Sequence, residues 1–483
     1  MKKVFFILLG LLFAICSCVK ESGTFDVQNN VDQDDQIIFV DPYRVTMDDL
    51  FEYLSITNTA KTKGDAAVKS IKPIKHDNDT VMYFIERNKG WEIISADKRA
   101  GVVMAYSNTG TESLEDLLSN PNINAWLSIR ANMISLIRET NLVDENDNTE
   151  QWECLLKDIK HKAQTKTIID GQPGWKRIGS TWSLVDSSSC PHQIETKWGQ
   201  GYPWNTCVPY SGVNHYYRCY NGCGPVAFGQ MLHWMHSKYG VPNYSYTSAS
   251  CSGYSNRYGH NYSFVFSDSS STAWAIMAKH YNDLNRSTNF VAFLLAKLGQ
   301  ILNAAYNING LEYPKESMDG TSININTVTL NKVSSYFGIN YDVDSYNDAT
   351  ILSNIMNYSK PSMIIVGSTL DTIAHVWIVD GYKYDRIQID KYYIYDPNNT
   401  YDPESLIEEE EEESGEEYSY GIVHIPEGYD FQIITEYHSN YYYLMNWGYN
   451  GIGDNAFYAA ESDWFYDDLY YDNRLVMITN FNI

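Results

Sequence analysis

A cysteine set between two glycines at the start of a helix constrains this chain more than any other feature. In the stretch 221–230, Cys223 stands between the glycines and Pro225 follows. Proline is well tolerated in the first turn of a helix, where its missing N–H would have no intrahelical partner. The open N–H groups and the positive dipole end of a helix favour a thiolate. The stretch therefore predicts a nucleophilic cysteine, and a buried, inert cysteine is the alternative.

The residues around Cys223 also predict its surroundings. Apolar side chains recur at helical spacing after the proline, at Ala227, Met231, Trp234 and Met235. Gly222 and Gly224 have no Cβ, so a substrate backbone could come close on either side of the thiol. We therefore expect Cys223 to open a helix and to face bound substrate.

The size and charge of the chain narrow its class. At 483 residues the chain should hold two or three domains. Its 60 acidic side chains outnumber 35 lysines and arginines, giving a net charge of −25. Nucleic acid is therefore excluded as the main partner, because phosphate binding needs a basic face. The 40 tyrosines and 12 tryptophans indicate either a β-rich core or a sugar-binding surface.

Residues 1–18 have the character of a targeting segment. Lys2 and Lys3 precede the apolar run 4–15, which is too short to span a bilayer. The run ends in Ile-Cys-Ser-Cys, which resembles a bacterial lipobox; this resemblance implies cleavage before Cys18 and lipid attachment there, an ordinary thiol being the alternative. We expect a bacterial lipoprotein of the cell envelope, held on the membrane through Cys18 or released after processing, in a compartment that permits disulfides.

The region from residue 19 to residue 172 predicts a tether, a small domain and a linker. Residues 19–42 are polar and are typical of a solvated tether. Strands are predicted at 81–85, 91–95 and 102–106, followed by helical residues from an N-cap at Ser113 to about Glu139. The polar composition of 140–172 indicates an exposed linker that a protease could cut, or a plain linker between domains.

The remaining residues, 173–483, predict a second domain that is helical first and strand-rich later. Helical runs lie between 290 and 337, and strand-like runs follow at 363–366, 376–379, 441–445 and 475–479. Six consecutive glutamates, 408–413, predict a solvated loop rather than a cation site, because the run has no EF-hand pattern. His233 and His236 are three residues apart on the predicted helix but lack a third ligand, so no metal site is expected.

A thiol nucleophile needs a base, and the best candidate is His375. It lies in an apolar strand-like run that stops at the turn signal Asp380-Gly381. It follows Cys223 by about 150 residues, the separation typical of papain-like peptidases. A core histidine without chemistry is the alternative.

Two further segments supply the other groups that such a site needs. Asn446 and Trp447 follow a predicted strand, so the amide could hold the imidazole tautomer and the indole could exclude water. A strand end with a turn is the alternative. Upstream of the cysteine, Gln200 could donate to a developing oxyanion, an interaction worth roughly 3–4 kcal/mol in comparable sites.

Together these segments resemble the streptopain family of bacterial papain-clan cysteine peptidases. The resemblance covers most of the chain and rests on Trp-Gly-Gln-Gly-x-Pro-x-Asn at 198–205 with Cys-x-Pro at 207–209, Gly-Cys-x-x-x-Ala at Cys223, His-x-x-x-Val-Asp-Gly at His375, and Asn-Trp-Gly at 446–448. The segment 91–106 is similar to the inhibitory propeptide of the family.

The resemblance implies an α+β fold and an order of domains. An α+β inhibitory prodomain, 43–172, should precede a papain-like domain, 173–483, in which the cysteine helix packs on an antiparallel sheet. The prodomain would inhibit the enzyme from within the chain and be cut away at about 165–180. Substrates would be proteins or peptides, with no cofactor and no metal.

The resemblance also implies roles for single residues. Cys223 would be the nucleophile, His375 the base, and Gln200 a donor to the oxyanion. Trp447, more than Asn446, would lie against the histidine.

The chain departs from the family pattern at three places. Ala374 stands where glycine is usual, Tyr449-Asn450 replaces Trp-Gly after the Asn-Trp-Gly segment, and an acidic insertion at about 383–435 separates His375 from Asn446. Apart from Cys16, Cys18 and Cys223, five cysteines remain, so at least one lacks a partner within the chain. Besides a lipid-anchored cysteine endopeptidase, the alternatives are a catalytically silent surface-binding protein on the same scaffold and a Cys-His amidase or transglutaminase.

Overall fold

One antiparallel sheet joins the N-terminal and C-terminal parts of the molecule. The computed structural model describes residues 41–59, 67–140, 149, 151–152, 156, 167–169, 172–211, 217–240, 249–251, 262–264, 274–283, 286–306, 321–323, 325–369, 372–398, 400, 419–420, 423, 425–460 and 474–483. In these residues the strand order of the main sheet is β1-β2-β3-β4-β16-β15-β13-β12-β17-β11, and β5, β6 and β14 join through β13 and β6. Every pairing in it is antiparallel. The predicted α+β fold class is confirmed.

The N-terminal part is a four-stranded meander with helices. Its elements are α1 (Met47–Thr59), β1 (Val68–His76), β2 (Asp79–Arg87), β3 (Trp91–Ser95), β4 (Val103–Ser107), α2 (Leu114–Ser119) and α3 (Pro121–Thr140). The three strands predicted from sequence correspond to β2, β3 and β4. Its sheet continues into the C-terminal part because β4 pairs with β16 (Phe457–Ala459).

The helical run predicted after Ser113 is two helices rather than one. Ser113 caps α2 through a capping box with Asp116, as its position predicts. Asn120 then leaves the helical conformation, at φ −83° and ψ 112°, because a residue that precedes proline is disfavoured in the α region. Pro121 opens α3, and the Asn120 side chain accepts the N–H groups of Asn122 and Ile123. The break places Asn122 in the first turn of a new helix.

The C-terminal part packs helices on both faces of its strands. The helices are α5 (Cys223–Tyr239), α7 (Thr288–Ile301), α8 (Thr327–Phe337) and α9 (Asp348–Tyr358). The central strands are β11 (Asn340–Ser345), β12 (Ser362–Thr369), β13 (Thr372–Tyr395), β15 (Phe431–Asn446) and β17 (Arg474–Asn482). Short pairs complete the described elements: β7 (Ala249–Cys251) with β8 (Tyr262–Phe264), and β9 (Ala305–Tyr306) with β10 (Thr321–Ser322).

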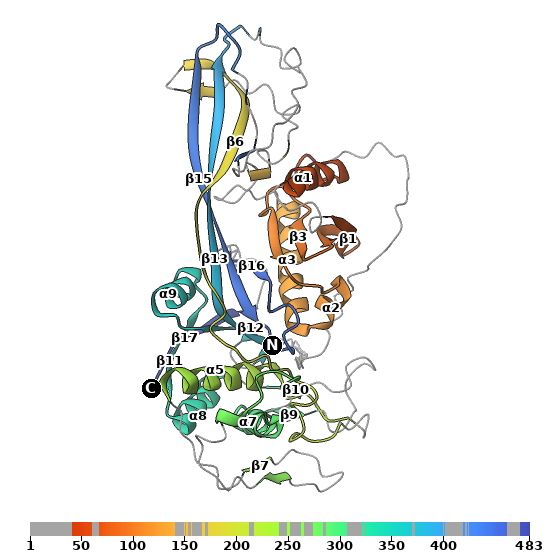
Figure 1. Ribbon diagram of the computed structural model, residues 1–483, viewed down its shortest axis with the longest axis vertical. Helices are drawn as coiled ribbons and strands as arrows, with labels where there is room; N and C mark the ends of the chain where they lie inside the picture. The colour runs from red at the N-terminus through yellow and green to blue at the C-terminus, as the bar shows by residue number, and fades with distance from the viewer. Residues whose placement is uncertain are drawn as a thin grey trace, which may run out of the picture.

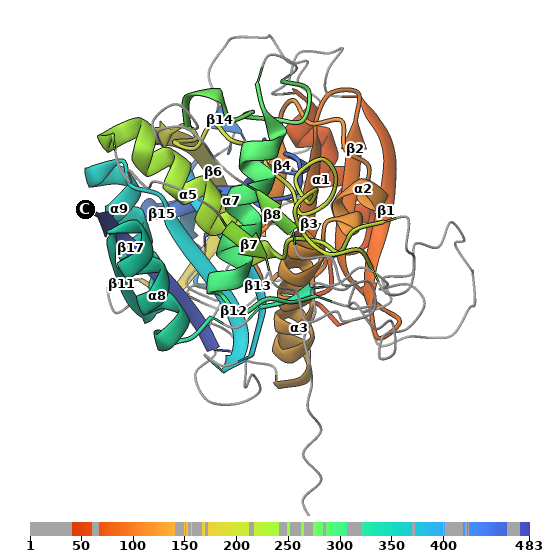
Figure 2. The same cartoon turned by 90° about the horizontal axis from the view of Figure 1, so that it is seen from below.

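Alternation along β13 divides the core between the two faces. Val376 and Ile378 pack with α5, α7 and α8, whereas Trp377 and Val379 pack in the core that also holds α9 and α3. The N-terminal part and the C-terminal sheet therefore share one hydrophobic core. Figures 1 and 2 show α5 and α7 side by side on one side of the sheet, with α3 among the N-terminal elements.

The region predicted as an acidic insertion is in large part an extended arm. β13 runs on through residues 383–395, paired with β15 on one side and with β6 (Gln172–Cys190) on the other. The three strands extend away from the body of the molecule (Figure 1). Near the far end, β6 also pairs with β5 (Thr167–Ile169) and β14 (Ser419–Tyr420).

Several predictions fall outside the described residues. These are the targeting segment with Cys18, almost all of the tether, and the glutamate run. The window predicted for the cut, 165–180, overlaps β5 and the start of β6, and its exact position stays a prediction. Within the described part of the chain, no helix is both long and apolar enough to cross a bilayer.

Candidate active site

The cysteine helix begins at Cys223 itself. Gly222 is the N-cap residue, at φ 89°, and no side chain caps this end of α5. Cys223, the first residue of the helix, is 2% exposed. The predicted start of the helix at Cys223 is confirmed, and the thiolate that a helix N-terminus favours there stays a prediction.

The two glycines beside Cys223 fit closely packed neighbours rather than an open approach. A Cβ on Gly224 would lie 2.3 Å from Cδ1 of Ile323, and one on Gly222 would lie 3.2 Å from Cγ2 of the same residue. The expectation that these glycines leave room for a substrate backbone is therefore wrong for this structure, because the segment after β10 already fills that space.

Gln200 is tied to the cysteine segment through its backbone. The carbonyl oxygen of Gln200 accepts the N–H of Asn221 at 3.0 Å, two residues before Cys223. The Gln200 side chain is 2% exposed, and neither its Nε2 nor its Oε1 has a hydrogen-bond partner among the described residues. A buried amide without partners costs stability, and such groups point to a catalytic role or an absent partner.

His375 lies on β13, where it pairs with Val366 of β12, and it is 4% exposed. Its Nδ1 is 3.0 Å from Oδ1 of Asn122, in the first turn of α3. The amide nitrogen of Asn122 donates to the carbonyl oxygens of Trp447, at 2.6 Å, and of Val376, at 3.3 Å. Since this orients Oδ1 as the acceptor, Nδ1 of His375 carries the proton.

Burial determines the protonation state of His375. Burial lowers the pKa of His375 to about 4, so the ring is neutral at physiological pH. The ring is hydrogen-bonded to Asn122 and not to Cys223. In this form of the chain the histidine cannot stabilise a thiolate as an imidazolium.

The predicted placement of Trp447 against His375 stays a prediction. The Trp447 ring packs on Trp377 and Tyr458, at centroid distances of 5.2 and 4.9 Å, and Asn122 bonds both His375 and the Trp447 backbone. The Asn446 amide is engaged elsewhere: its Oδ1 accepts Nε2 of Gln230 at 2.9 Å, and its Nδ2 donates to the carbonyl oxygen of Thr196 at 2.9 Å.

Gln230 connects the segments that the sequence analysis grouped together. It lies on α5, and its Oε1 also accepts the N–H of Trp198 at 3.1 Å. The helix of Cys223, the segment of Gln200 and the loop of Trp447 are thereby joined through one buried amide. Gln230 belongs to the stretch 221–230, but that pattern gives it no role.

A cavity and a pair of histidines lie near these residues. An open cavity of about 530 Å³ lies beside the Gln200 segment, lined by Tyr202, Pro203, Tyr281, Thr288 and Asn450. The rings of His233 and His236 both lie against Trp274, at 6.1 and 5.2 Å.

One residue of this site, Asn122, was missed at the level of sequence. It is a single polar residue in a segment that matches no catalytic pattern. Asn122 lies 253 residues from His375 in the chain, and only the tertiary structure brings them together. The Asn-Pro pair at 120–121 indicates a helix start but not what that helix contacts.

Two family models match two separate parts of the chain. Residues 198–395 match the model of the Peptidase C10 family, and residues 52–134 match that of the Spi protease inhibitor. No curated protein matches the chain. Among solved structures, a fragment of Prevotella intermedia prointerpain A is 17% identical, with a TM-score of 0.49, over 85% of this chain and 98% of that one. The active interpain A cysteine protease of the same organism is 17% identical, with a TM-score of 0.32, over 60% of this chain and 94% of that one.

The two family matches separate the roles of the two parts of the molecule. The part that carries Cys223, Gln200 and His375 is the peptidase, and the part that carries Asn122 is the inhibitor. The chain is therefore a cysteine peptidase of the streptopain family, peptidase C10, made as a zymogen with its own inhibitory prodomain.

Proposed function

We propose that this zymogen gives rise to an endopeptidase in which Cys223 and His375 form the catalytic pair. The Cys223 thiolate attacks a peptide carbonyl, and protonated His375 gives its proton to the leaving amine. The side-chain amide of Gln200 and the N–H of Cys223 stabilise the oxyanion. His375 then takes a proton from water, which hydrolyses the thioester and regenerates the thiol.

One observation carries this proposal. A single side chain of the inhibitory domain, Asn122, binds the ring of His375 and the backbone of Trp447. An inhibitor that acts on a hydrolytic centre has reason to contact the base, and Asn122 does so at Nδ1 of His375. The site then becomes active when Asn122 leaves and the His375 ring turns to the sulfur.

The unpaired amide of Gln200 supports the same assignment. Its position beside the cysteine segment leaves a buried N–H donor without an acceptor until a substrate oxygen arrives. The cavity lined by Tyr202 and Tyr281 adjoins this segment and offers apolar and hydroxyl contacts to a peptide.

The test replaces each member of the pair in the full chain. Cys223→Ala and His375→Ala should each abolish hydrolysis of casein and cleavage of the chain's own prodomain, while circular dichroism stays that of the parent. Ser128→Ala, which removes only an intrahelical hydrogen bond in α3, is the matched control and should process normally.

Either outcome is informative. Retained cleavage by a purified variant would remove the replaced residue from the mechanism. Folded parent protein that hydrolyses peptidoglycan or transfers acyl groups, but leaves casein intact, would favour the amidase or transglutaminase alternative.

The proposal includes attachment to the cell envelope through lipid on Cys18. Its support is the basic and apolar leader that ends at Cys18. Cells fed an alkyne-labelled fatty acid should label the parent chain, and Cys18→Ser should abolish the label and release the protein from membranes. A labelled Cys18→Ser chain would contradict the assignment.

A further inference from the structure

The imidazole of His192 lies between two oxygen acceptors beside the active site. Its Nδ1 is 2.6 Å from Oδ1 of Asp380, and its Nε2 is 2.6 Å from the backbone carbonyl oxygen of Asp454. A carbonyl oxygen has no proton to give, so Nε2 must donate. The other carboxylate oxygen of Asp380 accepts the N–H of Ile194 at 2.9 Å, as an ionised acid does. Both ring nitrogens therefore donate, and the ring is an imidazolium.

The two acceptors of His192 belong to two different catalytic segments. Asp380 lies on β13, five residues after His375, and is fully buried. Asp454 lies in the loop after β15, and its Oδ1 accepts the N–H of Trp447 at 3.0 Å. The ring of His192 thus links the strand of the catalytic histidine to the loop of Trp447.

The backbone of the loop from Trp447 to Asp454 is irregular. Between Trp447 and Asp454 four residues take positive φ angles: Gly448 at 66°, Asn450 at 57°, Gly451 at 83° and Gly453 at 77°. Turn hydrogen bonds from Ile452 to Tyr449 and from Asp454 to Gly451 hold the loop from within, and contacts from neighbouring segments add to them.

We propose that His192, as an imidazolium, is a positioning residue of the peptidase that fixes the Trp447 loop against the His375 strand. This inference rests on the proposed roles of Cys223 and His375.

The charges around His192 agree with a cation there. Asp380 faces it from β13, Asp454 from the loop, and Lys197 and Cys190 flank it on its own segment. Burial lowers the pKa of His192, but the charge of Asp380, the hydrogen bond to it and Asp454 outweigh burial and raise the pKa to about 9. Burial raises the pKa of Asp454 to about 6, against the Trp447 N–H and the charges of His192 and Lys197.

Loss of the cation has two consequences. The buried carboxylates of Asp380 and Asp454 repel each other without it, which favours protonation of Asp454 and weakens its bond to Trp447. Since the pKa of His192 is above the unfolded value of about 6.5, its contribution to stability is complete below that pH and is lost as pH rises through about 9.

The experiment compares variants of the full chain after self-processing. His192→Gln should lower kcat on a peptide substrate by about 10-fold or more, because displaced catalytic groups are costly, with KM within about twofold. His192→Lys, which restores a cation, should recover part of the lost kcat. His280→Gln makes the same chemical change at an exposed histidine and should behave as the parent.

A second measurement determines the protonation state of His192 directly. In the Cys223→Ala full chain, ¹⁵N spectra of labelled histidine should show both His192 nitrogens protonated at pH 8, the signal being assigned by its loss in His192→Gln. The midpoint of its titration should coincide with the loss of kcat in the parent near pH 9.

The contradicting results are distinct. Unchanged kcat in His192→Gln, a neutral ring at pH 8, or a titration that does not track kcat would each overturn the inference. If His192→Gln does not fold, loss of the signal in His192→Lys assigns it instead, and the comparison of the parent's kcat with the ¹⁵N titration still decides. A parent chain without hydrolytic activity would instead refute the proposed function, and the ¹⁵N result would stand apart from it.

Discussion

Asn122 and His375 are joined by a hydrogen bond of 3.0 Å between the inhibitory domain and the peptidase domain. The same amide binds the carbonyl oxygen of Trp447 at 2.6 Å. Helix α3 of the inhibitory domain therefore contacts the base of the proposed pair directly. The Nδ1 atom of His375 that bonds Asn122 is not available to the sulfur, so a catalytic pair formed through Nδ1 requires Asn122 to leave.

Replacement of Asn122 should weaken inhibition. Asn122→Ala removes three hydrogen bonds and leaves buried acceptors without donors, so the free energy of unfolding of the Cys223→Ala chain should fall by about 1–3 kcal/mol. In the otherwise unaltered chain, self-processing followed on gels should become several-fold faster. Ser128→Ala, on the same helix, should change neither quantity. Slower processing in Asn122→Ala would show that the contact aids cleavage instead.

Replacing Gln200 should raise the stability of the zymogen and lower the activity of the enzyme. Gln200→Met removes a buried amide without partners, so the zymogen should become more stable by about 1 kcal/mol, measured by urea unfolding. The same change removes a donor to the oxyanion, so kcat should fall by about 10²- to 10³-fold. Gln230→Met is the contrasting variant, because its amide bonds Asn446 and Trp198 and its loss should destabilise the chain. Full activity in Gln200→Met would exclude the oxyanion role.

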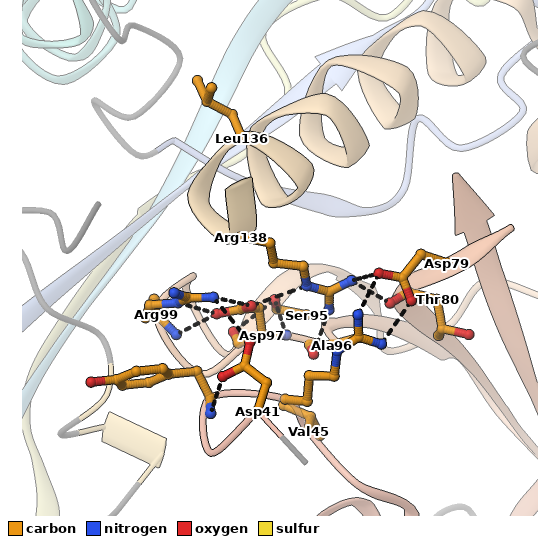
Figure 3. A network of polar contacts seen from close by, with 12 residues as sticks. Asp41, Val45, Asp79, Thr80, Ser95, Ala96, Asp97, Arg99, Leu136 and Arg138 are labelled. Carbon is orange, nitrogen blue, oxygen red and sulfur yellow. Dashed lines mark hydrogen bonds and ion pairs between the residues drawn. The ribbon is translucent and has the colours of Figure 1, made fainter. Parts of the chain in front are cut away.

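The far end of the inhibitory helix is fixed by buried charge. Figure 3 shows Arg138 between Asp97 and Asp79, bonded also to the carbonyl oxygens of Thr80 and Ala96. Arg138→Met leaves the fully buried Asp97 with one arginine fewer, so we expect a loss of about 3 kcal/mol and faster processing.

Arg44 provides the matched control for Arg138. Its bidentate pair with Asp79 is exposed, so Arg44→Met should cost less than about 1 kcal/mol. Equal losses in the two variants, measured by urea unfolding of the Cys223→Ala chain, would refute the importance of burial in this network.

Acid should destabilise the zymogen through His375. The folded pKa of about 4 lies below the unfolded value of about 6.5. As pH falls through this window the unfolded chain binds a proton that the folded chain refuses, which costs up to about 3 kcal/mol. Urea unfolding of the Cys223→Ala chain should show this slope, and His375→Gln should reduce it.

A second histidine contributes to the loss of unfolding free energy at low pH, and it needs its own control. His233 also has a pKa lowered to about 4, by burial first of all. His233→Gln should therefore remove a separate share of the slope. A slope unchanged by His375→Gln would mean that the histidine is protonated in the zymogen.

Local sequence patterns predicted the helix starts, because these depend on residues that are close together in the chain. The glycines and Pro225 predicted where α5 begins, and Ser113 predicted the start of α2. The arm was not foreseen as a sheet, because β6 is rich in serine and has no apolar periodicity. Its strand character comes from pairing with β13, a contact between residues about 200 positions apart.

The same reasoning explains what was right and what was missing at the site. Cys223 and Gln200 lie in glycine- and proline-marked turns whose shape is local. The contacts of His375 and Trp447 with Asn122 are set by how two domains meet, and those of Asp454 by how distant segments of the peptidase part meet. Asn446 had a role inferred from its motif, but its amide bonds Gln230, which a motif does not reveal.

The most direct test of this account is the reactivity of Cys223 before and after loss of the prodomain. Iodoacetamide labelling from pH 4 to pH 9, read by mass spectrometry, separates full-length and processed chains in one sample. In the full-length chain Cys223 should react slowly and only as pH rises toward the ordinary thiol pKa of about 8.5, whereas in the processed chain it should react rapidly near pH 5–6. Identical profiles in the two forms would contradict the account.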